Sequence, residues 1–111
     1  MEDNSHAGQG PVVLDIGGDI GALVVSMPAA LSGAEVEARP VAGEALGSYA
    51  DHLPHVAVLA RPGSPVRHVA VFAELRAGEY ELHLRPDHPV RLTAVVRGGE
   101  VSTAAWPAEP G

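Results

Sequence analysis

Glycine and proline interrupt this sequence so often that no long helix fits between them. The chain of 111 residues contains 13 glycines and 10 prolines, and both residue types destabilise the interior of a helix. The apolar segments between these breaks are short and rich in valine, alanine and leucine, a pattern typical of β-strands. The sequence therefore predicts an all-β protein with at most one short helix.

The segments between the breaks alternate apolar and polar residues or form short valine-rich runs. The expected strands span residues 12–16, 19–27, 34–39, 55–61, 66–72, 79–85, 90–97 and 100–106. Short strands at a spacing of roughly 8–12 residues predict a two-layer antiparallel sandwich of about 7–8 strands. We expect one hairpin between the first two strands and another between the fourth and the fifth. Residues 41–54 are expected to form a loop with one or two helical turns at most.

The length of the chain allows one domain. We expect a disordered N-terminal tail over residues 1–10, a single sandwich domain over residues 11–107 and a short C-terminal tail over residues 108–111.

Charge and composition exclude several classes of function. Seven arginines and no lysine stand against fourteen acidic residues, a formal charge of -7, so the chain has no basic stripe for nucleic acid. It has no cysteine for a disulfide or thiolate site and no apolar run of the roughly 20 residues that a membrane helix needs. The acidic N-terminus lacks the basic start and apolar centre of a signal peptide. We therefore expect a cytoplasmic protein with no nucleic-acid partner and no membrane span.

Four residues in the second half of the chain recur in a known pattern. An aromatic residue, Phe72, is followed by Leu75, then by Gly78, and then by Tyr80 at the start of an alternating strand. Over residues 70–106 the chain resembles transthyretin-like modules, which include prealbumin-like and carboxypeptidase-regulatory-like sandwiches. The resemblance implies a β-sandwich in which the glycine permits a tight turn and the large residues cap the core. One branch with this fold hydrolyses hydroxyisourate and ends in Tyr-Arg-Gly-Ser; this chain ends in AAWPAEPG, so we do not expect that activity.

The six histidines suggest a metal site as one alternative. His52 and His55 are three residues apart, and His68 lies on the next expected strand, across the predicted hairpin. With Asp51 they could bind a divalent transition metal such as Zn, Ni or Cu, because neutral imidazoles are common ligands of these ions. The other interpretation is that these histidines lie apart on the surface, and metal analysis of protein without a histidine tag tests between the two. His83, on the polar face of a later strand, predicts only a cross-strand polar contact.

Several expected strands are apolar on both faces, although a two-layer sandwich buries only one face of each strand. If Phe72 points into the core, its neighbours along the strand point outward. The expected interface residues are Ala57, Leu59, Val69 and Val71. An exposed apolar patch of this kind indicates association, and a closed homodimer buries the same patch on both subunits. In a monomer, the loop over residues 41–54 would instead cover the patch, with Leu46, Tyr49 and Leu53 over it.

These observations favour a non-catalytic binding or assembly module that forms a homo-oligomer and could also bind a protein partner. The alternative is a small metal-binding protein that uses the histidine cluster. A hydrolase is the weakest alternative, because no serine lies in a GxSxG motif and no residue stands out as catalytic.

Overall fold

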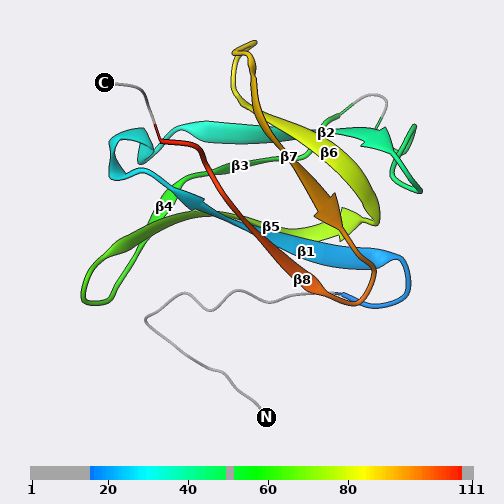
Figure 1. Cartoon of the computed structure of the whole chain (residues 1–111), viewed down its shortest axis with the longest axis horizontal. Helices are drawn as coiled ribbons and strands as arrows, with labels where there is room; N and C mark the ends of the chain where they lie inside the picture. The colour runs from blue at the N-terminus through cyan, green and yellow to red at the C-terminus, as the bar shows by residue number, and fades with distance from the viewer. Residues whose placement is uncertain (1–15, 50–51, 109–111) are drawn as a thin grey trace.

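The computed structural model describes residues 16–49 and 52–108. These residues form two four-stranded β-sheets packed face to face (Figure 1). The strands are β1 (Ile20–Met27), β2 (Glu35–Ala42), β3 (His55–Ala57), β4 (Leu59–Arg61), β5 (Arg67–Arg76), β6 (Gly78–Leu84), β7 (Val90–Val96) and β8 (Val101–Ala105), and a short 3-10 helix, η1 (Ala29–Leu31), follows β1. The predicted all-β sandwich is confirmed. The expected strand over residues 12–16 lies, except for Ile16, outside the described residues.

The first sheet has the order β4-β5-β1-β8, and the second has the order β3-β2-β6-β7. Neighbouring strands are antiparallel except β1 and β8, which run parallel. The tight turn expected between the first two predicted strands does form, since Gly17 and Ile20 exchange backbone hydrogen bonds of 2.9 Å. Beyond this turn, β5 and β8 occupy the two edges of β1. The other strand of the expected hairpin lies outside the described residues except for Ile16.

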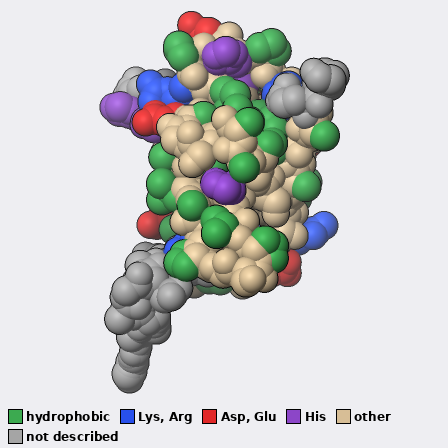
Figure 2. All heavy atoms as spheres, turned by 90° about the vertical axis from the view of Figure 1, so that its left-hand side faces the viewer, with side chains coloured by type: hydrophobic (Ala, Val, Ile, Leu, Met, Phe, Trp, Pro, Cys, Tyr) green, Lys and Arg blue, Asp and Glu red, His purple; other side chains and the backbone are tan. Residues whose placement is uncertain are grey.

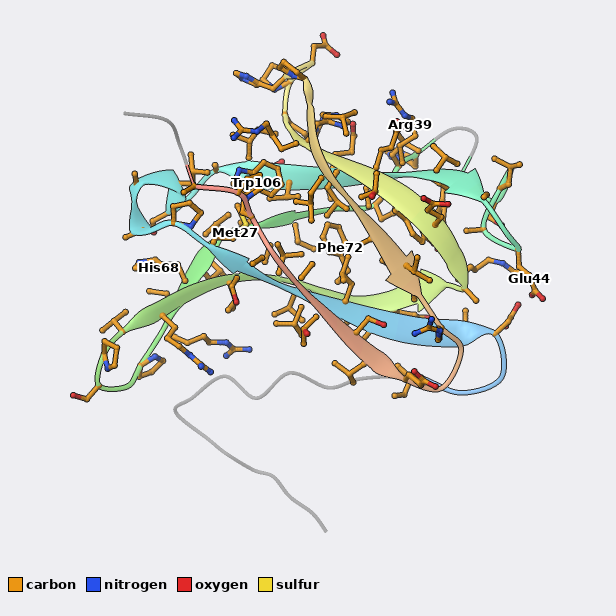
Figure 3. The ribbon with its side chains drawn as sticks, viewed as in Figure 1. Met27, Arg39, Glu44, His68, Phe72 and Trp106 are labelled. Carbon is orange, nitrogen blue, oxygen red and sulfur yellow. The ribbon has the colours of Figure 1, made fainter. Side chains whose placement is uncertain are left out.

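The core lies between the two sheets and is built from the residues that alternate inward along each strand. The buried apolar side chains are Ala22, Leu23, Val25, Met27, Val36, Ala38, Ala45, Val58, Ala70, Phe72, Leu75, Tyr80, Leu82, Ala94, Val96 and Trp106. Phe72 lies midway between the sheets, while Met27 and Trp106 lie together at one end, near His68 (Figure 3).

The four residues of the recurring pattern surround the point where the chain crosses from the first sheet to the second. Phe72 and Leu75 are buried at the end of β5, and Tyr80 is buried near the start of β6. The Tyr80 hydroxyl donates a hydrogen bond of 2.6 Å to the carbonyl oxygen of Arg76. The pattern is thus a corner between sheets rather than a hairpin turn, and the tyrosine ties the corner back to the preceding strand.

The strand expected over residues 55–61 is divided between the two sheets. β3 pairs with β2 in the second sheet, whereas β4 pairs with β5 in the first. Val58, between them, is fully buried, and its backbone N–H donates a 2.8 Å hydrogen bond to the carbonyl oxygen of Ala34. Alternation predicts only which side chains are buried, and it is unchanged when a strand moves from one sheet to the other.

Strand β2 continues through Pro40, where we expected it to end. Pro40 pairs with Tyr80 of β6 on one side, and a register shift follows before Ala42. On the other side, β3 covers only Glu35–Glu37. The N–H that proline lacks would point to this uncovered side, so its absence costs the sheet no ladder hydrogen bond.

Candidate interaction surface

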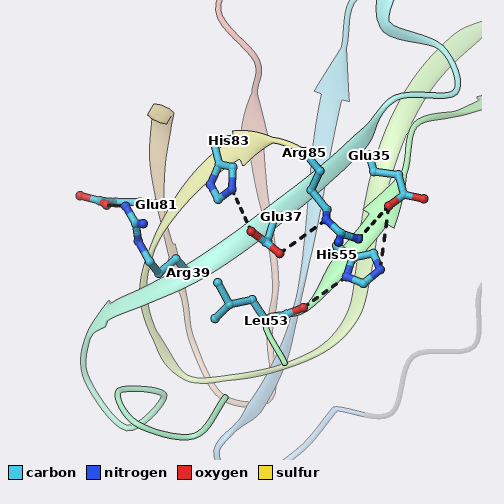
Figure 4. A network of polar contacts seen from close by, with 8 residues as sticks. All are labelled: Glu35, Glu37, Arg39, Leu53, His55, Glu81, His83 and Arg85. Atoms are coloured by element: carbon cyan, nitrogen blue, oxygen red, sulfur yellow. Dashed lines mark hydrogen bonds and ion pairs between the residues drawn. The ribbon is translucent and has the colours of Figure 1, made fainter. Parts of the chain in front are cut away.

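The outer face of the second sheet carries paired charged side chains along β2 and β6 (Figure 4), with exposed valines such as Val95 of β7 beside them. His83 Nε2 lies 2.8 Å from Glu37 Oε1, and Arg85 Nη1 lies 3.1 Å from Glu35 Oε1. Farther along, Arg39 Nη2 donates a hydrogen bond of 2.7 Å to an oxygen of Glu81. This is the composition expected of a sheet face in contact with water.

The outer face of the first sheet has the opposite character. The strand registers place Leu59, Val69, Ser26 and Ala105 in one row across the four strands. The next row contains Val71, Val24 and Thr103. Neither row contains a charged side chain, although both lie on the side of the sheet that faces away from the core.

A groove of about 340 Å³ lies on this outer face, beside the point where the chain crosses from β3 to β4. Its lining includes Ala57, Leu59, Val69, Val71 and Ala73, together with Arg61 at the end of β4. Leu59 is 61% exposed. The structure therefore brings the four predicted interface residues together around one apolar groove.

Exposure within this groove is uneven. Leu59 is exposed, whereas Val69 and Val71 are half-buried by their neighbours. Figure 2 shows the end of the sandwich that carries the β4–β5 turn and η1, where hydrophobic side chains are scattered among backbone and other uncharged atoms, a histidine lies near the centre, and charged groups lie mainly at the margins.

The loop over residues 43–49 lies at the other end of the sandwich and does not cover the groove (Figure 1). Ala45 is buried there, and its backbone N–H donates a 2.9 Å hydrogen bond to the carbonyl oxygen of Ala77. The Tyr49 hydroxyl accepts a 3.1 Å hydrogen bond from the backbone N–H of Arg76. The alternative in which Leu46 and Tyr49 cover the apolar patch is therefore wrong, and Leu46 itself is 61% exposed.

The structure places the predicted metal ligands in different parts of the fold. His55 is on β3, with Nε2 at 3.9 Å from Glu35 Oε1, while His68 is on β5, opposite Met27 and Ala60. His52 is exposed before β3, and Asp51 lies outside the described residues. Within residues 16–49 and 52–108, no three His, Asp or Glu residues are grouped to hold a metal. The hairpin pairing that we assumed applies only to β4, so the metal site stays a prediction without support from this register.

The burial of His83 and the position of Arg61 beside the groove were not predicted from the sequence. His83 makes the cross-strand contact that we predicted, but its side chain is only 8% exposed, so the contact is almost buried. Arg61 lines the apolar groove, and its place at the polar end of an apolar strand was the signal that could have identified it.

Comparison of the chain with protein-family models, with curated proteins and with solved structures finds no match. The resemblance to transthyretin-like modules therefore stays a prediction that rests on the sequence. In the part of the chain that the structure describes, no helix is long and apolar enough to cross a membrane.

Proposed function

We propose that this chain is a non-catalytic binding and assembly module that associates with a second copy through the outer face of its first sheet. The observation that carries the proposal is the contrast between the two outer faces. The second sheet carries Glu35, Glu37, Arg39, Glu81 and Arg85 outward, as a sheet in water should. The two rows across the first sheet carry aliphatic and small uncharged residues in the equivalent positions.

Burial of this face supplies a driving force for association, because apolar area removed from water contributes about 25 cal/mol per Å². Flat sheet faces can also pack about a two-fold axis, so that the same residues of both copies are buried. The net charge of -7 keeps copies apart at long range, which favours a closed dimer over open-ended aggregation.

Substitution Val71→Arg tests the proposal. Val71 lies in the middle of the apolar face, opposite Val24, and a buried arginine without a partner strongly disfavours an interface. We expect the wild type to be a dimer by light scattering at tens of micromolar and the variant to be a folded monomer.

Thr93→Arg is the matched control, because Thr93 is exposed and lies opposite Glu81 on the second sheet. It adds the same charge to the other outer face and should leave the mass of the dimer unchanged. A wild type that is monomeric at these concentrations would contradict the proposed association.

A further inference from the structure

Strand β8 forms one edge of the first sheet (Figure 1), and its sequence lacks the features that usually protect an edge. Its five residues, Val101–Ala105, include no charged side chain and no proline. By contrast, the edge strand β4 is only three residues long, and the edge strand β7 of the second sheet carries Arg91. Charges, prolines and short strands keep sheet edges from pairing with further strands. The edge of β8 is therefore suited to accept a strand.

The backbone hydrogen bonds show which groups of β8 face away from β1. The carbonyl oxygen of Glu100 accepts a 3.0 Å hydrogen bond from the Ala22 N–H, and the Trp106 N–H donates a 2.8 Å hydrogen bond to the carbonyl oxygen of Ser26. Successive residues of a strand direct their N–H and C=O groups to opposite edges, so the even-numbered residues of β8 bond to β1. No described strand pairs with the odd-numbered ones on their other side. These residues are Val101, Thr103 and Ala105.

The chain enters the first sheet on the side of β8. Gly17 and Ile20 exchange backbone hydrogen bonds of 2.9 Å, and the Gly99 N–H donates another of 2.9 Å to the carbonyl oxygen of Ile20. The N–H and C=O groups of one strand residue point to the same edge, so Gly17 and Gly99 lie on the same edge of β1. From Val101 onward, β8 occupies this edge. The chain that precedes Gly17 therefore cannot continue along β1, and the next edge on this side of the sheet is that of β8.

The segment that precedes this turn has the sequence of a strand. Residues 12–16 are Val-Val-Leu-Asp-Ile, preceded by Pro11, and valine, leucine and isoleucine fit a half-buried strand position. The segment has five residues, the length of β8. The Gly17–Ile20 bridge is antiparallel, and β8 is parallel to β1. A segment that continues the direction of Gly17 would therefore run antiparallel to β8.

We propose that residues 12–16 add to the free edge of β8 as a further antiparallel strand of the first sheet. Main-chain hydrogen bonds to Val101, Thr103 and Ala105 supply the affinity, as in other cases of strand addition. The Gly17–Ile20 turn tethers the segment beside the edge and gives it a high effective concentration there. The added strand closes the edge against strands of other chains and leaves the outer face of the sheet for association. The inference goes beyond the proposed function, because it concerns the edge of the first sheet and not its face.

Amide hydrogen exchange of the full chain, followed by NMR, tests the proposal at Thr103, in the middle of β8. The Thr103 amide should exchange slowly in the wild type, with backbone NOEs between β8 and residues 12–16. In Val13→Pro/Leu14→Pro the segment loses an N–H from each of its edges, so the Thr103 amide should exchange at least about tenfold faster. The amides of Ser102 and Ala104 point to β1 and should stay protected in both proteins.

Asn4→Pro/Ser5→Pro is the matched control, because it adds two prolines before the segment and should leave the exchange of Thr103 unchanged. Circular dichroism melting shows that both variants are folded. Rapid exchange of the Thr103 amide in the wild type would overturn the proposal. Equal protection in Val13→Pro/Leu14→Pro, or protection that is lost on dilution, would also reject it, because a strand of a second copy would then fill the edge.

Discussion

Gly78 is a single position on which the corner between the two sheets depends. A Cβ atom added at this residue would lie 2.5 Å from the carbonyl oxygen of Ala42 and 3.1 Å from the Cβ of Ala45. Both neighbours belong to the chain that packs across the corner, so neither can move away without shifting backbone. The close approach of two backbone segments is a role that only glycine fills here.

We expect Gly78→Ala to lower the free energy of unfolding by about 1 kcal/mol or more, measured by urea denaturation. Gly47→Ala is the control, because Gly47 has a φ of +85° but nothing within 4 Å of an added Cβ. It has a conformational cost without the clash, and should therefore destabilise less. An unchanged urea midpoint for Gly78→Ala would contradict the packing of this corner.

The Tyr80 hydroxyl makes the stability of the same corner depend on pH in the alkaline range. Burial, and next the hydrogen bond with Tyr49, raise the pKa of the Tyr80 hydroxyl far above its usual value of 10. The fold therefore favours the neutral hydroxyl. The stability that this preference contributes is fully present below about pH 10, and it is lost as the pH rises from there toward the raised pKa.

We expect the free energy of unfolding of the wild type to fall as the pH is raised above about 10, and that of Tyr80→Phe to fall less steeply. At neutral pH the variant should be less stable by about 1 kcal/mol, because the carbonyl oxygen of Arg76 loses its donor. Urea denaturation over a series of pH values measures both effects. Parallel pH profiles of the two proteins would show that the Tyr80 hydroxyl does not contribute.

Side-chain contacts join neighbouring strands, and the stability that each contact contributes depends on how deeply it is buried. β2 and β6 are joined by two cross-strand contacts on their outer face, Glu37 with His83 and Arg39 with Glu81 (Figure 4). The first pair has side chains that are 18% and 8% exposed, and the second has side chains that are 49% and 33% exposed. Water can replace a lost partner at the exposed pair but not at the buried one.

We expect Glu37→Ala to destabilise by about 1–3 kcal/mol, because it leaves the buried His83 ring without its partner. Glu81→Ala should cost at most about 1 kcal/mol, the range of exposed ion pairs. The two variants make the same chemical change on the same sheet face. Glu37 also lies 3.7 Å from Arg85 Nε, so their urea midpoints compare a more buried carboxylate that contacts two basic groups with an exposed one that contacts one. Equal losses would show that the His83 contact is worth no more than a surface pair.

At the scale of the whole molecule, the two outer faces of the sandwich differ in the polarity of their side chains. The outer face of the second sheet is satisfied within the chain, since its acidic and basic groups pair across β2, β3 and β6. That of the first sheet presents aliphatic side chains, with Leu59 the most exposed of the groove residues. The association that we propose therefore uses this surface and not the charged one.

Several features could be predicted from the sequence because they depend on neighbours along the chain. Glycine and proline limit each strand locally, and alternation states which side chains share a face, so the all-β class followed directly. The core position of Phe72 and Tyr80 was instead implied by the family resemblance. The same period of two placed Val69 and Val71 away from the core, where the structure has them. These inferences needed no knowledge of which strands meet.

Which strands pair with one another was decided only by the tertiary structure. The division of residues 55–61 between two sheets separates His55 from His68 and creates the groove beside Leu59, yet it leaves the alternation of the sequence unchanged. The parallel pairing of β1 with β8 joins segments more than seventy residues apart. Pro40 remains in a strand because, among the described strands, none pairs with that edge of β2 at this residue. The alternation of apolar and polar residues along a strand predicts which side chains are buried. Which strand lies beside it depends instead on packing between distant segments.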